Sequence, residues 1–182
     1  YEKFQKIPYD ESMLKYGSDK PDLRNPLIIS DLSDIFIRDD VTFEIFKQLV
    51  KSGSKVRCIV TKNTKGKPRS FFDNIDKWAK EQGASGLAYF TIEKNENISA
   101  KGPVGKFFSK EALEKIMKIT EAGVGDSIFF ACGKINDVEK ITSQARDKIA
   151  KDLDLIDENS FAFCWIVDYP MFEKNEVTNK IE

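Results

Sequence analysis

The amino-acid sequence predicts an α+β fold, with a mainly antiparallel sheet and helices packed on one of its faces. Three observations lead to this class. Hydrophobic residues make up 41% of the 182 residues, which is enough to bury a core. Three segments carry apolar residues at helical spacing, and short apolar runs of strand length lie between them. The resulting order, strand–strand–helix–strand–helix–strand–helix, suits an antiparallel sheet covered by helices and not a long alternating parallel one.

The predicted strands are short apolar runs bounded by turn residues. Phe43–Phe46 is expected to pair with Lys55–Thr61 across a Ser-Gly-Ser turn. Gly86–Glu93 and Ser127–Cys132 follow in the middle of the chain, and Phe161–Asp168 lies near its end. The first four runs are expected to form the sheet.

Three helices are predicted from capping residues and apolar stripes. The first begins at a Ser70 cap and ends at Gly83, and the second begins at a Ser109 cap and ends at Gly123. The third begins at an Asn136 cap. The stripes are Phe71, Phe72, Ile75, Trp78 and Ala79 in the first helix, Ala112, Leu113, Ile116, Met117 and Ile119 in the second, and Val138, Ile141, Ala145, Ile149 and Leu153 in the third. Each helix is therefore expected to bury one face.

The chain divides into a middle, residues 27–157, and two ends that cannot form a core of their own. Residues 1–26 contain a short helix around Asp10–Tyr16 and a loop punctuated by glycine and proline. Residues 158–182 contain one strand and a polar tail. Because the chain also begins without Met, we expect it to be a segment of a longer protein.

Composition excludes several kinds of catalytic centre. There is no histidine, which removes Ser-His-Asp chemistry, histidine-ligated zinc and histidine general bases. The cysteines Cys58, Cys132 and Cys164 form no CxxC pair, so reduced thiols in a cytosolic protein are expected and a thiolate zinc site is not. Residues 102–107 look like a phosphate loop but lack its first glycine and its Ser or Thr. No apolar run approaches the length of a membrane span.

A basic span free of acidic residues lies between Ile45 and Phe72, in a chain whose net charge is −1. One interpretation is a patch that contacts nucleic-acid phosphates. The alternative is a solvated sheet edge, where lysine opposes aggregation. The pattern favours neither. The candidates for phosphate contact are Lys55, Arg57, Lys62, Lys65, Lys67 and Arg69.

Residues 16–24 are the most unusual stretch of the chain: Tyr-Gly-Ser-Asp-Lys-Pro-Asp-Leu-Arg. They place a helix end, a turn, a proline and two acid–base pairs within one short segment. We expect a rigid loop in which Arg24 is free to bind a carboxylate or a phosphate. The alternative is an ordinary surface loop with internal ion pairs, which composition favours.

This nonapeptide resembles, residue for residue, a stretch of bacterial-type aspartyl-tRNA synthetases. Further segments that resemble the same family are Ile7–Met13, Gly83–Tyr89, Lys106–Phe108, Gly125–Phe130 and Phe163–Glu173. The resemblance covers nearly the whole chain. The middle resembles the α+β insertion domain that these enzymes carry between class II motifs 2 and 3. A related domain occurs in the B subunit of the tRNA-dependent amidotransferase.

The resemblance implies a fragment of an aspartate–tRNA ligase: the insertion domain at 27–157, flanked by partial catalytic-domain stems at 1–26 and 158–182. The parent would be a cytoplasmic homodimer that uses ATP and Mg²⁺ to attach aspartate to tRNA. The alternative is an independent tRNA-associated binding module related to the amidotransferase domain, but the flanking motifs would then be unexplained. Whether the parent charges the Asp tRNA alone or also the Asn tRNA stays open.

Motifs 2 and 3 of the family, which hold the ATP-binding arginines, match no part of this chain. The resemblance therefore assigns no catalytic, cofactor-binding or metal-binding residue here, and the segment is expected to be inactive alone. The stem loop expected near the parent's active site contains Ser18, Asp19, Lys20 and Arg24. Because an inserted domain leaves and re-enters its host at neighbouring points, residues 16–24 and 165–171 are expected on the same side of the module.

Overall fold

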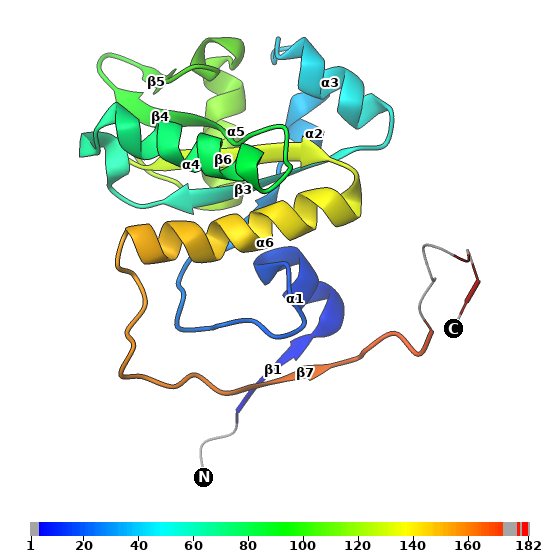
Figure 1. The fold of residues 1–182 in the computed structure, drawn as a ribbon. Coiled ribbons are helices and arrows are strands. Elements are labelled where there is room, and N and C mark those ends of the chain that lie inside the picture. Colours follow the sequence, from blue (N-terminus) through cyan, green and yellow to red (C-terminus); the bar gives the residue numbers. More distant parts are fainter. Residues whose placement is uncertain (1–3, 173–177, 179, 182) are drawn as a thin grey trace.

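A five-stranded antiparallel sheet forms the centre of the fold in the computed structural model, which describes residues 4–172, 178, 180 and 181 (Figure 1). The strands lie in the order β2 (Ile29–Asp31), β3 (Lys55–Thr61), β6 (Ser127–Gly133), β4 (Ala88–Lys94) and β5 (Ile98–Lys101). Strands β3 and β6 pair along their whole length, from Lys55 opposite Gly133 to Thr61 opposite Ser127. The predicted α+β class and antiparallel sheet are confirmed.

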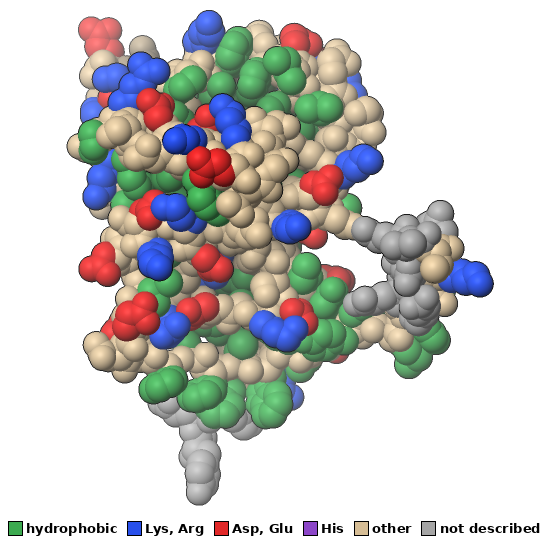
Figure 2. Space-filling view, viewed as in Figure 1, with side chains coloured by type: hydrophobic (Ala, Val, Ile, Leu, Met, Phe, Trp, Pro, Cys, Tyr) green, Lys and Arg blue, Asp and Glu red, His purple; other side chains and the backbone are tan. Residues whose placement is uncertain are grey.

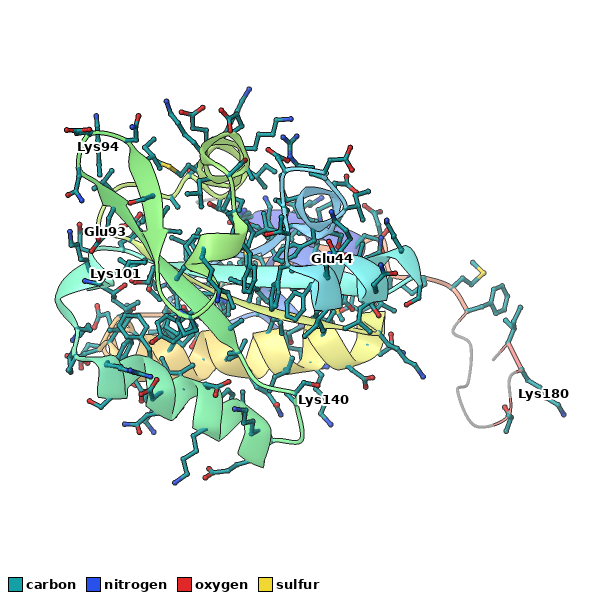
Figure 3. The ribbon with its side chains drawn as sticks, turned by 90° about the horizontal axis from the view of Figure 1, so that it is seen from above. Glu44, Glu93, Lys94, Lys101, Lys140 and Lys180 are labelled. Atoms are coloured by element: carbon teal, nitrogen blue, oxygen red, sulfur yellow. The ribbon has the colours of Figure 1, made fainter. Side chains whose placement is uncertain are left out.

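Helices cover both faces of this sheet, so the predicted one-sided arrangement is wrong. Helices α4 (Arg69–Glu81) and α6 (Ile135–Asp152) lie on one face, and α2 (Ser33–Phe36), α3 (Glu44–Lys51) and α5 (Lys110–Thr120) lie on the other (Figure 3). The side chains of Ile59 and Phe129 pack against α4 and α6, whereas those of Cys58 and Phe130 pack in the opposite core. Strands that are apolar on both sides have to be covered on both sides.

The segment predicted as a first strand, Phe43–Phe46, instead leads into helix α3. Phe46 contacts the core with its ring centroid 5.9 Å from that of Phe130, whereas the neighbouring Ile45 is 68% exposed. Phe43, Phe46 and Val50 pack against the same core at helical spacing. The predicted hairpin is therefore wrong, and the antiparallel partners of β3 are β2 and β6.

The three predicted helices are confirmed as α4, α5 and α6, but only one predicted cap is. The Ser109 hydroxyl accepts a hydrogen bond from the Ala112 backbone N–H at 2.9 Å, as an N-cap does. Helices α4 and α6 begin at Arg69 and Ile135, so Ser70 and Asn136 lie inside the first turn and not before it.

One short strand from each stem lies beyond α6, and the two strands run side by side (Figure 1). Strands β1 (Gln5–Pro8) and β7 (Cys164–Val167) form a two-stranded parallel sheet, and α1 (Tyr9–Tyr16) lies between this sheet and α6. The rings of Tyr9 and Tyr169 are 5.1 Å apart, and the Tyr169 hydroxyl lies 3.4 Å from the Asp19 carbonyl oxygen. The expectation that the two stems meet on one side of the module is confirmed.

Candidate nucleic-acid interface

The basic span runs from α3 through β3 and the short 3₁₀ helix η1 (Thr64–Gly66) to the first turn of α4. On the face shown in Figure 2, basic and acidic side chains are interspersed and do not form one continuous basic patch. The availability of each candidate cation therefore depends on its own partners.

Arg57 is not available to a phosphate. Its side chain is 7% exposed and forms ion pairs with Asp31 on β2 and, at 3.5 Å, with Glu139 on α6. Burial raises the pKa of Asp31, but hydrogen bonds from Ser33 and the charge of Arg57 outweigh this effect and bring that pKa below its ordinary value. Burial between β2 and α6 therefore argues against a phosphate contact at Arg57.

The other five candidates reach the solvent. Lys55 lies exposed at the start of β3. The ammonium of Lys62 lies 2.6 Å from the Glu121 carbonyl oxygen and 3.0 Å from a carboxylate oxygen of Asp126, yet the side chain is 58% exposed.

Lys65, Lys67 and Arg69 lie together at one end of the sheet. Lys65 pairs with Glu93 at 3.3 Å, and the ammonium of Lys67 lies 5.9 Å from the centre of the Phe71 ring. Arg69 pairs with Asp73 at 3.3 Å, with 84% of its side chain exposed. All three side chains line one cavity of about 540 Å³.

Two further residues of this cavity, Tyr89 and Lys101, were missed by sequence reasoning. Lys101 lies on β5, far along the chain from the basic span. The pairing of β4 with β5 places it opposite Thr91, and its ammonium lies 3.8 Å from Glu93. No local pattern marks either residue, because only strand pairing brings them to the span.

The charged side chains of the protein loop at residues 18–24 form ion pairs with one another. Lys20 pairs with Asp19 at 2.9 Å, and the Ser18 hydroxyl accepts a hydrogen bond from the Lys20 backbone N–H at 3.0 Å. The guanidinium of Arg24 donates three hydrogen bonds to the Asp22 carboxylate, at 2.7, 2.9 and 3.2 Å. These bonds lower the pKa of Asp22. The structure therefore matches the internally paired loop, and Arg24 already has a carboxylate partner.

Arg146 on α6 holds this loop in place and was also missed. It is 2% exposed, and its guanidinium donates hydrogen bonds of 2.7 Å to each of the Leu27 and Asn25 carbonyl oxygens and one of 2.9 Å to the Asp22 carbonyl oxygen. Its charge also lies 5.0 Å from the centre of the Tyr16 ring. Thr142, Arg146 and Ala150 are buried four residues apart. This second stripe of α6 is the signal that could have revealed a buried arginine.

The described residues form neither a metal-binding cluster nor a helix that could cross a membrane. They contain no group of three or more His, Cys, Asp or Glu side chains able to hold a metal ion. Burial raises the pKa of the Cys58 thiol to about 12 and that of Cys132 to about 11, so neither is a thiolate near neutral pH. None of the described helices has both the length and the apolar character that a membrane crossing needs.

Comparisons with known proteins identify the family. The model of the GAD domain matches residues 46–142. An aspartate–tRNA(Asp/Asn) ligase of Pelagibacter ubique is 91% identical over all 182 residues, which cover 31% of that protein. Ligases of the same name from Beijerinckia indica and Rickettsia bellii are each 47% identical, over 95% and 98% of the chain and 29% of their own length. The chain thus spans about 30% of these relatives, and it belongs to the GAD domain family.

Proposed function

We propose that the chain is the accessory segment of an aspartate–tRNA ligase, an enzyme that attaches aspartate to tRNA. The observation that carries this proposal is the 91% identity to the Pelagibacter ubique ligase over all 182 residues of this chain. The names of the three relatives include both the Asp and the Asn tRNA. We therefore extend the proposal to a parent that charges both.

The paired stems support an inserted domain. Strand β1 of the first stem and strand β7 of the second lie side by side, which is what we expect of a domain that leaves and re-enters its host at neighbouring points. Several large apolar side chains of these stems are exposed, including Phe163 at 64%, Trp165 at 60% and Phe172 at 65%. Apolar side chains gather at the lower edge of the molecule in Figure 2. We propose that the rest of the ligase covers them, whereas an independent binding module would leave them in water.

The chemistry of the reaction is assigned to the rest of the parent. Activation of aspartate by ATP needs Mg²⁺ and positive charges arranged around the reacting phosphorus. We assign no catalytic, ATP-binding or metal-binding residue to this chain, and we place the homodimer contacts outside it as well. For the proposed ligase we also propose a cytoplasmic location. Ser18, Asp19, Lys20 and Arg24 remain candidates for a loop near the active site.

The role proposed for the basic span is contact with tRNA phosphates. The five exposed candidates are Lys55, Lys62, Lys65, Lys67 and Arg69. A few phosphate contacts give affinities of about 10⁻⁴ to 10⁻⁶ M at physiological salt, without preference for sequence. We therefore expect the span to help position tRNA and not to select it.

An ATP–pyrophosphate exchange assay on the purified 182-residue chain tests whether the residues that activate aspartate lie outside this chain. We expect no exchange above background, because the ATP-binding motifs match no part of the chain. A Ser18→Ala/Arg24→Ala variant prepared in parallel is the control, since equal traces in both preparations indicate a contaminating host enzyme. Sustained turnover at the rate of a full-length ligase, reduced in the variant, would contradict the proposal.

A further inference from the structure

We propose that the cavity between η1, the start of α4 and the β4–β5 hairpin binds a nucleoside phosphate, either as a free nucleotide or as an unpaired nucleotide of an RNA. The cavity has a volume of about 540 Å³, within the range of small-molecule sites. The proposal rests on the proposed function only for RNA as one of the two sources. The charges and the aromatic floor of the cavity support nucleotide binding independently of that function.

The rim of the cavity is strongly cationic. Lys65, Lys67, Arg69 and Lys101 line it together with a single carboxylate, that of Glu93, so that its lining carries a formal charge of +3. This charge is concentrated at one place in a chain whose net charge is −1. An anion is therefore the ligand that the rim favours.

Glu93 positions two of these cations. Its side chain is 17% exposed and lies 3.3 Å from the ammonium of Lys65 and 3.8 Å from that of Lys101. Figure 3 shows Glu93 and Lys101 next to each other on the β4–β5 hairpin. The two lysines stay 51% and 77% exposed, so each keeps N–H donors for a second anion. A phosphate between them would accept charge-assisted hydrogen bonds.

The first turn of α4 adds to the positive potential at the rim. Pro68 precedes the helix, Arg69 begins it, and the first turn contains no acidic residue. The partial positive charge of the helix amino end adds to the charge of Arg69, whose nearest carboxylate, that of Asp73 in the next turn, lies 3.3 Å away. Arg69 and Phe72 from this turn both line the cavity.

The floor of the cavity is aromatic. The rings of Phe72 and Tyr89 stack with their centroids 4.6 Å apart and their planes 13° apart, and Pro103 also lines the cavity. Tyr89 lines the cavity although the residue is only 9% exposed. Burial raises the pKa of Tyr89, so the hydroxyl stays protonated and can donate or accept a bond from the edge of a base.

A ligand that carries a phosphate beside an apolar, planar group would contact both the cationic rim and the aromatic floor of the cavity. Inorganic phosphate would use only the cationic rim, and an uncharged nucleoside only the floor. The bases of a duplex are paired and stacked, so they cannot enter a pocket, whereas unpaired bases can. A nucleotide with an unpaired base is therefore the class of ligand that fits best.

Titration of the ¹⁵N-labelled chain followed by NMR tests the proposal, with AMP, adenosine, inorganic phosphate, single-stranded oligoadenylate and a hairpin RNA of matched length as probes. We expect saturable shifts for AMP that centre on residues 65–72, 89–93 and 101–103, with weaker binding of adenosine and of phosphate. Stronger binding of oligoadenylate than of AMP would identify RNA as the source, and the reverse order would identify a free nucleotide.

Two matched variants on one hairpin locate the site. Lys101→Gln is expected to weaken AMP binding about fivefold, because it removes a charged hydrogen-bond donor at the rim. Lys94→Gln makes the same change in charge on the same hairpin but outside the cavity, and less than about a twofold effect is expected. Tyr89→Phe keeps the stacked ring and tests the hydroxyl alone.

The proposal is overturned if AMP binds no better than phosphate and adenosine, or if both lysine variants weaken it equally. Retention of salt-sensitive tRNA binding in that case would leave the proposed function standing. If the chain instead binds AMP but does not bind tRNA, the proposed phosphate contacts with tRNA are wrong and the nucleotide pocket stands.

Discussion

Replacement of Arg146 with methionine is expected to lower the free energy of unfolding by about 3 kcal/mol. The guanidinium donates hydrogen bonds to the carbonyl oxygens of Asp22, Asn25 and Leu27 in a site that is almost fully buried. Methionine fills much of the same volume but leaves these three acceptors without a charged donor. Urea denaturation followed by circular dichroism measures the loss.

The control for this variant is Lys148→Met on the same helix. Lys148 forms an i,i+4 pair with Asp152 and is 33% exposed, so a loss below about 0.5 kcal/mol is expected. Arg146→Met should also expose the loop at residues 16–27 to trypsin before global unfolding, because this arginine ties the loop to α6. Equal losses in the two methionine variants, with an unchanged trypsin pattern, would show that Arg146 has no clamping role.

Charge reversal at Lys55, Lys67 and Arg69 is expected to weaken tRNA binding by about tenfold or more. The slope of log Kd against log salt is expected to fall by about one for each phosphate that the variant no longer neutralises. These side chains are suitable because they are exposed and because none of them holds the fold together. Titration of tRNA into the Lys55→Glu/Lys67→Glu/Arg69→Glu variant at two salt concentrations measures both quantities.

The matched control reverses the same number of charges on helix α5, on the opposite face of the sheet. Lys110, Lys115 and Lys118 are likewise exposed, so Lys110→Glu/Lys115→Glu/Lys118→Glu changes the net charge equally. We expect this control to retain most of the affinity. If both triple variants lose affinity equally, net charge and not the basic span governs binding, and the alternative of a solvated sheet edge is correct.

The parts of the fold that could be predicted are those encoded by long local patterns. Helices α4, α5 and α6 carry apolar stripes over three turns or more, and strands β3, β4 and β6 are apolar runs between turns. Phe43–Phe46 was misassigned because four residues are too few to separate a period of two from a period of 3.6. The stripe of each helix shows which side is buried but not which face of the sheet it covers, so the two-sided packing could not be predicted.

The candidate site was predicted only in part, for a similar reason. The run of lysines is visible in the sequence, but the partners that bury Arg57 lie on β2 and α6, and those that complete the cavity lie on β4 and β5. Such long-range pairs depend on strand register and helix placement. The internal ion pairs of residues 16–24 are the alternative that composition favours over a free Arg24, because Asp22 and Arg24 are only two residues apart.

The central claim, that this chain serves as the accessory segment of an aspartate–tRNA ligase, is tested most directly by exchange into a full-length enzyme. The matching segment of the Pelagibacter ubique ligase would be replaced by these 182 residues, which are 91% identical to it. Aminoacylation of the Asp tRNA by the hybrid is expected within about threefold of the unmodified ligase, because most substitutions away from buried networks change stability little. A hybrid that is folded, binds tRNA and yet fails to attach aspartate would contradict the claim.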